Sequence, residues 1–248
     1  VACIGDYAFY NCMGLQEVSL GGAVASIGYG AFKNCLELSK ISMDIVAGKS
    51  HCLNAILQDE FQEVDVTLNY LDEDGMALSQ ARLVFTDYQY EYVPEIEARQ
   101  FNWETYGSGE SYRVSIRGTD IDYLKYDSVF PVAMVEGDLP TLVKIAAGRL
   151  CFPHKLAGEY RAKYENYLKD NMASVMEMII SGNHAPDTAA LLLEYILTHR
   201  LLMQDALLNA MKLAQKYERP EITAQLMAYG GRQEMHVKGN DVRARFSL

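Results

Sequence analysis

The sequence predicts a mixed α+β fold in three parts: the end of a solenoid of stacked coils, a small β-rich middle region and an α-helical C-terminal region. Three observations support this prediction. A 23-residue repeat fills the N-terminal part, a run of alternating β-branched residues follows it, and helical periodicity begins at Asp138. The expected divisions are residues 1–46, 47–135 and 136–231, with a polar tail over residues 232–248.

The N-terminal repeat appears when residues 24–43 are written below residues 1–20. At this offset of 23, the pattern I-G-x-x-A-F-x-N-C-x-x-L-x-x-[VI]-x-[LM] occurs twice, and after Ile45 it stops. Each coil is too small to bury its own apolar side chains, so stacking must bury one coil against the next. Such solenoids need about three coils, and we therefore expect further coils before Val1.

Two cysteines match at this offset, Cys12 and Cys35. We expect both in the stack as free, small apolar side chains, with a disulfide between them as the alternative. The chain has five cysteines, an odd and sparse set that does not resemble a disulfide framework. The cysteines favour a reducing compartment, so we expect a cytoplasmic protein rather than one on the cell surface.

The repeat pattern resembles the BspA-like class of bacterial leucine-rich repeats, over less than a fifth of the chain. The resemblance implies the end of a leucine-rich-repeat solenoid whose strand face recognises another protein. Because alternate residues of a strand point to opposite sides, the candidates on this face are Glu17, Ser19, Lys40 and Ser42. Glu17 and Lys40 would be neighbours of opposite charge on adjacent strands, an interaction of about 0.2–1 kcal/mol, or no more than a solvated ion pair.

The middle region has the pattern of a small β-sheet. Four segments are strand candidates: 64–71, 81–88, 98–106 and 111–116. The turn signal Asp72–Gly75 joins the first two as a hairpin, and Gly107 and Gly109 separate the last two. We expect this sheet to cap the open end of the solenoid, because exposed coil ends need a cap.

The middle region is also acidic and aromatic, with 16 acidic and 6 basic residues over residues 47–135. Eight of the 17 tyrosines lie between Tyr70 and Tyr126, together with Phe101 and Trp103. Clustered aromatic residues can form a binding hot spot. The alternative is that they belong to the core and the sheet faces, as β propensity predicts.

The C-terminal third has helical period, and residues 139–150 and 158–169 are predicted helices. In the second, Tyr160, Tyr164 and Tyr167 form a stripe that indicates a packed face. A second repeat has an offset of 34, which aligns Pro186 with Pro220 and three further pairs: Ala190 with Ala224, Leu192 with Leu226 and Tyr195 with Tyr229. Both prolines fit the first turn of a helix, and Gly230 and Gly231 are expected to end the last helix.

Residues 210–231 resemble the paired helices of an ankyrin-type repeat, although the T-P-L-H tetrapeptide of that family is missing. This ankyrin-like resemblance implies a module that binds or caps protein. Segments 126–131, 149–153, 160–168 and 221–224 are similar to the C-terminal region of leucine-rich-repeat proteins from Gram-positive, gut-type bacteria. That similarity supplies no activity.

No catalytic, phosphate-binding or metal-binding motif is found in the sequence. It lacks G-x-x-x-x-G-K-[ST], G-x-G-x-x-G and G-x-S-x-G, and its five histidines form no H-x-x-x-H pair: His51, His154, His184, His199 and His236. We therefore expect no catalytic residue, no cofactor, no metal and no small-molecule substrate. An enzyme would need a polar pocket that gives His51 or Cys151 a base partner.

These observations favour a non-catalytic protein–protein interaction scaffold or adaptor with a protein partner. A net charge of −11 argues against nucleic acid, and no apolar run reaches the roughly 20 residues of a membrane span. The first alternative is a cell-surface BspA-like adhesin that contacts a host, and the second is an enzyme with an unrecognised site. The polar tail is expected to be mobile, or else to dock Arg243 and Arg245 onto the acidic middle region.

Overall fold

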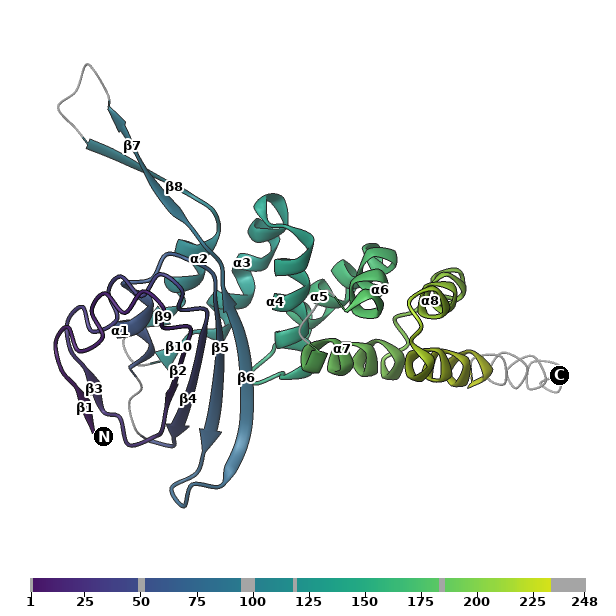
Figure 1. Ribbon diagram of the computed structural model, residues 1–248, viewed down its shortest axis with the longest axis horizontal. Coiled ribbons are helices and arrows are strands. Elements are labelled where there is room, and N and C mark those ends of the chain that lie inside the picture. The colour runs from purple at the N-terminus through teal and green to yellow at the C-terminus, as the bar shows by residue number, and fades with distance from the viewer. Residues whose placement is uncertain (1, 49–51, 95–100, 118–119, 183–185, 233–248) are drawn as a thin grey trace. The chain divides into compact units, whose positions relative to one another are not determined.

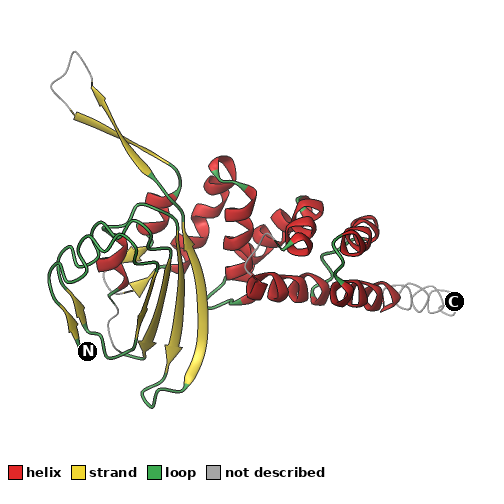
Figure 2. Cartoon of the chain, in the orientation of Figure 1, coloured by secondary structure: helices red, strands yellow, loops and turns green. Residues whose placement is uncertain are grey.

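The computed structural model describes residues 2–48, 52–94, 101–117, 120–182 and 186–232 (Figure 1). It is a mixed α+β structure, with a β-rich N-terminal region and a helical C-terminal region, as the sequence predicts (Figure 2). The chain divides into two compact units, Val1–Arg161 and Ala162–Leu248.

A four-stranded sheet forms the centre of the first unit, with the order β2–β4–β5–β6. Its strands are β2 (Glu17–Leu20), β4 (Lys40–Val46), β5 (Val64–Leu71) and β6 (Ala77–Phe85). The first three are parallel, and β5 and β6 form the predicted antiparallel hairpin. On the return side of the coils, β1 (Cys3–Ile4) pairs in parallel with β3 (Ser26–Ile27).

The strand register confirms the 23-residue offset, because Glu17 lies beside Lys40 in the parallel ladder. Asn11 and Asn34 occupy matching positions and both have left-handed backbone, with φ of 61° and 66°, a conformation that asparagine tolerates better than most residues. The interior of the second coil is fully packed, and its buried side chains are Ala31, Phe32, Cys35 and Leu38. Cys12 and Cys35 are free thiols, as expected, although Cys12 is exposed.

The expectation that the repeat stops after Ile45 is wrong. β5 continues the parallel ladder, with Lys40 beside Asp65, so a third turn follows at an offset of 25. The return segment of this turn is the short helix α1 (Leu53–Leu57), which buries Leu53, Ile56 and Leu57 in place of the A-F-x-N-C motif. The altered length and the helix conceal the third turn from a comparison at a fixed offset.

The predicted cap is therefore not a separate sheet. The β5–β6 hairpin belongs to the same four-stranded sheet as β2 and β4. Helices α3 (Tyr123–Glu136) and α4 (Leu139–Cys151) contact the outer edge of β6 around Arg82 and Val84. The hydroxyl of Tyr126 accepts a hydrogen bond from the Val84 amide (2.9 Å) and donates one to the Val84 carbonyl (2.8 Å). A buried ion pair between Arg149 and Asp127 (2.7 Å) joins the two helices. Covering an edge strand in this way prevents further strand pairing.

Of the other two strand candidates, one is confirmed in part and one is wrong. β8 (Phe101–Tyr106) pairs antiparallel with β7 (Gln89–Pro94), which covers the described part of the predicted strand over 98–106. The predicted strand over 111–116 is instead helix α2 (Gly109–Arg113), followed by β9 (Ile116–Arg117), which pairs with β10 (Asp120–Ile121).

Tertiary hydrogen bonds explain the helix at α2. The Arg113 guanidinium donates to the carbonyls of Thr86 (2.6 Å) and Gln62 (2.9 Å), and Tyr112 is completely buried. These contacts override local strand propensity.

Tyr112, Tyr123 and Tyr126 belong to the aromatic cluster of the middle region, and all three are buried in the core. For these tyrosines the packing interpretation is therefore the correct one. The side chains of the β7–β8 pair lie outside the described part of the chain.

The second unit is helical. α5 (Gly158–Asp170) contains the boundary between the units, and α6 (Met172–Ser181), α7 (Pro186–Thr198), α8 (Gln204–Lys216) and a helix over residues 220–232 follow it. α6 packs against α8, and both prolines begin their helices, as predicted. Leu192 and Leu226 match at the offset of 34 and are both completely buried.

The predicted helix end at Gly230 and Gly231 is wrong, because the helix continues through both glycines to residue 232. At Gly230, a Cβ would lie 3.3 Å from the Leu207 side chain, so this glycine serves close packing against α8. The polar tail, with Arg243 and Arg245, lies outside the described residues.

Candidate functional site

The outward face of the β2–β4–β5–β6 sheet carries the residues that the sequence predicts there. Glu17, Ser19 and Lys40 are exposed and Ser42 is half-buried, whereas the residues between them are buried. The strand register arranges the outward residues in three rows across the sheet: Glu17, Lys40 and Asp65; then Ser19, Ser42, Thr67 and Arg82; then Asp44, Asn69 and Gln80. We call these residues the strand face.

The first row has opposite charges side by side. Glu17 and Lys40 are ladder neighbours, as predicted, and Asp65 is the next residue along the row. Among the described residues, neither Glu17 nor Lys40 forms an ion pair within 4.0 Å. Both charges are exposed and therefore available to an external partner.

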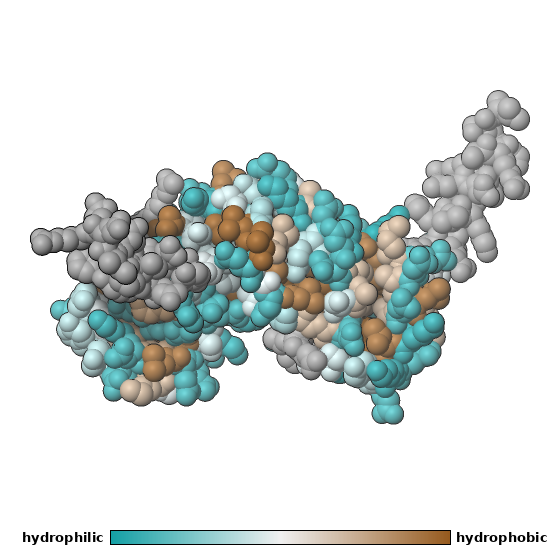
Figure 3. All heavy atoms as spheres, turned by 90° about the horizontal axis from the view of Figure 1, so that it is seen from above, coloured by the Kyte–Doolittle hydropathy of each residue, from teal (hydrophilic) through white to brown (hydrophobic). Residues whose placement is uncertain are grey.

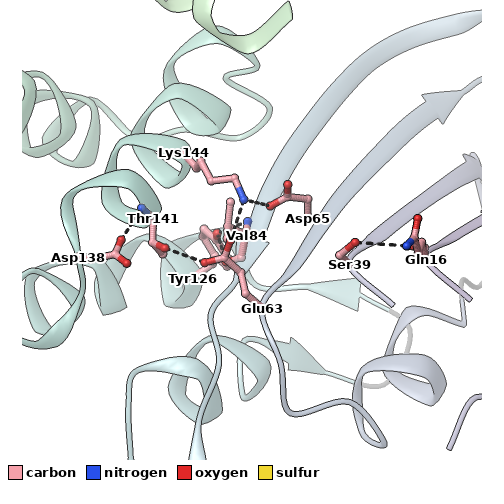
Figure 4. A network of polar contacts seen from close by, with 9 residues as sticks. All are labelled: Gln16, Ser39, Glu63, Asp65, Val84, Tyr126, Asp138, Thr141 and Lys144. Atoms are coloured by element: carbon pink, nitrogen blue, oxygen red, sulfur yellow. Dashed lines mark hydrogen bonds and ion pairs between the residues drawn. The ribbon is translucent and has the colours of Figure 1, made fainter. Parts of the chain in front are cut away.

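The third member of the row is held from outside the sheet. The Lys144 ammonium on α4 lies 3.1 Å from the Asp65 carboxylate and 2.7 Å from that of Glu63 (Figure 4). Thr141 donates a further hydrogen bond to Glu63 (2.7 Å). Burial lowers the pKa of Lys144, but the Glu63 hydrogen bond and the two carboxylates outweigh it, so its pKa is raised. Lys144 therefore stays charged and fixes α4 to the edge of the strand face.

The third row is ordered by a directed chain of hydrogen bonds. Arg82 donates to the Gln80 side-chain carbonyl (3.3 Å), the Gln80 amide donates to Asn69 (2.8 Å), and the Asn69 amide donates to Asp44 (2.9 Å). The chain runs from a cation on β6 to an anion on β4, which orients both amides. The guanidinium of Arg82 also lies over the Phe152 ring, 4.2 Å from its centre. This part of the strand face is thus fixed before any partner binds.

The sequence prediction found Glu17, Ser19, Lys40 and Ser42 but missed Asp44 on β4 and the strand-face residues of β5 and β6. The alternation of Asp65, Thr67 and Asn69 was the signal for the missing part. It was recognised as a strand but assigned to a separate sheet, because the parallel pairing of β5 with β4 was not anticipated.

The described candidates His154 and Cys151 do not belong to the rows of the strand face. His51, His184 and His236 lie outside the described residues. The ring of His154 stacks on Tyr70, with centroids 4.0 Å apart, and its Nδ1 lies 2.8 Å from the Ser79 hydroxyl. Burial, followed by the charges of Lys155 and Arg149, lowers the pKa of His154. A ring held in this way is a packing element.

The described part of the chain offers no group of three or more His, Cys, Asp or Glu side chains arranged to hold a metal ion. Cys151 is half-buried, and it lines neither the cavity between α7 and residues 220–232 nor the one beside Tyr123 and Lys155. Within the described ranges, none of the helices has both the length and the apolar character that a membrane crossing needs.

Comparison with known proteins supports the repeat assignment. Residues 1–67 match the family model of the BspA type leucine rich repeat region (6 copies). The match includes α1 and the first residues of β5, in agreement with the third turn of the sheet. Neither the curated proteins nor the solved structures contain a match to this chain.

Proposed function

We propose that this protein is a non-catalytic scaffold or adaptor that binds another protein through the strand face. The observation that carries the proposal is the first row, in which Glu17 and Lys40 are exposed, opposite in charge and unpaired. The BspA-type repeats suggest a protein-interaction role. In this structure Glu17 and Lys40 lie on the outward side of the repeat strands.

Two further features support this use of the strand face. The hydrogen-bond chain from Arg82 to Asp44 holds polar groups in place, which reduces the ordering cost on binding. The Tyr126 hydrogen bonds occupy the backbone of β6 at Val84, which disfavours the addition of a partner strand there. A partner would therefore bind the face of the sheet rather than this edge. A partner surface with complementary charges would meet Lys40 and Glu17 directly.

The C-terminal unit supports the scaffold interpretation as a second repeat module. The 34-residue offset, the two proline-initiated helices and the packing of α6 on α8 are features expected of an ankyrin-like pairing. The five free cysteines favour a reducing compartment, and we place the protein in the cytoplasm on that basis. The alternative is a cell-surface adhesin, which the BspA-type repeat favours.

A charge-swap variant tests the proposal. The double substitution E17K/K40E keeps the net charge and the attraction across the ladder but reverses the pattern presented to a partner. The wild-type full chain is used to capture partners from separated cytosolic and envelope fractions of the source organism, and the affinity of the purified partner is then measured. We expect the swap to weaken binding by about tenfold, the effect of charge pairs at an interface.

The matched control is E177K/K212E, which swaps two exposed charges on α6 and α8. It should bind like the wild type. Equal affinity of the partner for the wild type and E17K/K40E would exclude the strand face. A partner captured only from the envelope fraction would favour the adhesin.

A further inference from the structure

The second unit has an apolar groove between α7 and the helix over residues 220–232. Exposed apolar side chains occur on both units, and Figure 3 shows them as brown areas among hydrophilic atoms. Separately, the apolar residues between these two helices line a cavity of about 920 Å³, and most of them are buried or half-buried. Its floor includes the buried side chains of Ile179 and Leu193, and its walls include the half-buried side chains of Leu197 and Ile222. The groove thus has an apolar floor, with polar and charged side chains among its other lining residues.

The groove is long and follows the helices. Its lining residues run from Ala189 to Thr198 on α7 and from Pro220 to Arg232 on the other helix. At 1.5 Å per residue, the two walls are about 15 and 20 Å long, which corresponds to about three to four helical turns. Alanines on the walls, among them Ala190 and Ala228, leave the space between the helices unfilled. An elongated apolar groove of this length fits one face of a short helix.

The charges around the groove favour a basic occupant. Glu194, Glu218 and Glu221 line it and are exposed, and none of their carboxylates has a hydrogen-bond or ion-pair partner among the described residues. The two cationic lining residues are directed to backbone carbonyls: Arg219 donates to Ile180 (3.1 Å) and Arg232 donates to Ala228 (3.2 Å). The three carboxylates therefore outnumber the two guanidinium groups, and the lining carries a net negative charge.

We propose that this groove binds a basic amphipathic helix of a partner protein. The apolar residues of that helix, spaced at i, i+3 or i+4 and i+7, contact the floor between α7 and residues 220–232. Its lysine or arginine side chains pair with the three rim carboxylates. This surface lies on a different unit from the strand face, so the inference goes beyond the proposed function and does not depend on it.

The test uses the full chain and a fluorescently labelled 15-residue peptide of leucine and lysine, with the leucines on one helical face. Fluorescence anisotropy at physiological salt gives the affinity. We expect the triple variant E194Q/E218Q/E221Q to weaken binding by about tenfold, because each exposed ion pair contributes modestly. Neutral glutamine at three exposed positions should preserve folding, which circular dichroism checks.

The matched control is E177Q/D187N/D205N, which removes three exposed carboxylates of the same unit that do not line the groove. It should bind the peptide like the wild type. A peptide of the same composition with its leucines scattered should bind at least tenfold more weakly than the amphipathic one.

Four results would overturn the proposal. If both triple variants weakened peptide binding equally, or if the scattered peptide bound as well as the amphipathic one, the binding would be a general attraction between a basic peptide and an acidic protein. A photoreactive leucine in the peptide should cross-link to residues 189–198 or 221–232. Cross-links confined to the first unit, or an apolar dye in the groove that the peptide does not displace, would exclude a helix as its occupant.

Discussion

At the scale of the residue, burial separates two phenylalanines that the repeat aligns. Phe9 and Phe32 stack with ring centroids 5.1 Å apart, yet Phe32 is 1% exposed and Phe9 is 39% exposed. The free energy of unfolding should therefore depend strongly on Phe32 and weakly on Phe9.

Phe32→Ala should lower the free energy of unfolding by about 3–5 kcal/mol, because it removes a buried ring and leaves a cavity. Urea denaturation of the full chain measures the loss. Phe9→Ala is the control and should cost less than half as much. A loss below about 1 kcal/mol for Phe32→Ala would mean that the coil core does not depend on this ring.

Glu60 is a buried acid that no sequence motif indicated. It is 1% exposed, its Oε2 accepts a hydrogen bond from Gln62 (2.6 Å), and its Oε1 has no partner. Burial raises the pKa of Glu60 from 4.5 to about 7, with Asp59 adding to the rise and the Gln62 hydrogen bond and Arg113 opposing it. Because the folded protein holds this proton more tightly, Glu60 stabilises the fold most below pH 4.5 and loses that contribution as the pH rises through 7.

The expected loss from Glu60 is up to about 3 kcal/mol, from the size of the pKa shift. Glu60→Gln cannot ionise, so its free energy of unfolding should fall less between pH 5 and pH 8 than that of the wild type. Chemical denaturation at several pH values compares the two. Parallel pH profiles for the two proteins would show that Glu60 does not titrate in this range.

At the scale of the element, short-range patterns predicted the strands of the four-stranded sheet and the helices from α4 onward, but not α1, α2 or α3. Alternation identified β5 and its hairpin with β6, and proline marked the first turns of α7 and the helix over residues 220–232. The helix α2 was missed because hydrogen bonds from Arg113 to distant carbonyls determine it. These hydrogen bonds join residues far apart in the chain, so no local sequence pattern could have revealed them.

At Gly148, the contact between helix α4 and strand β6 outweighs helix propensity. It lies in the middle of α4, where helix propensity alone predicts a gain of about 1 kcal/mol for alanine. However, a Cβ at this position would lie 2.6 Å from the backbone carbonyl oxygen of Arg82 on β6. Gly148→Ala should therefore destabilise the protein by about 1–3 kcal/mol, as overpacking does.

The matched control is Gly231→Ala in the helix over residues 220–232, where a Cβ meets no atom within 4 Å. At this position only the higher helix propensity of alanine should matter, so the substitution should stabilise the protein by up to about 1 kcal/mol. Thermal denaturation of the two variants gives opposite signs if α4 contacts the backbone of β6. A gain in both would mean that the two elements are farther apart.

At the scale of the whole molecule, the strand face shows why a site is harder to predict than a fold class. The repeat in the sequence located Glu17 and Lys40, and the register confirmed them as neighbours. Lys144 joins the same surface from α4, about a hundred positions along the chain from Lys40, and only the covering of the β6 edge brings it there. Periodicity reveals what one element presents, but not which elements meet.

The division into two compact units gives the last prediction, because each unit has a buried core of its own. Calorimetry of the full chain should resolve two unfolding transitions, as expected when separate cores unfold separately. Phe32→Ala should lower the midpoint of one transition, and Leu226→Ala, which truncates a completely buried side chain of the second unit, should lower the other. A single transition that both substitutions shift would show instead that the two cores unfold as one cooperative structure. In the case of a single transition, a partner bound to the strand face would stabilise the helical unit as well. Two separate transitions would mean that binding to one unit does not stabilise the other.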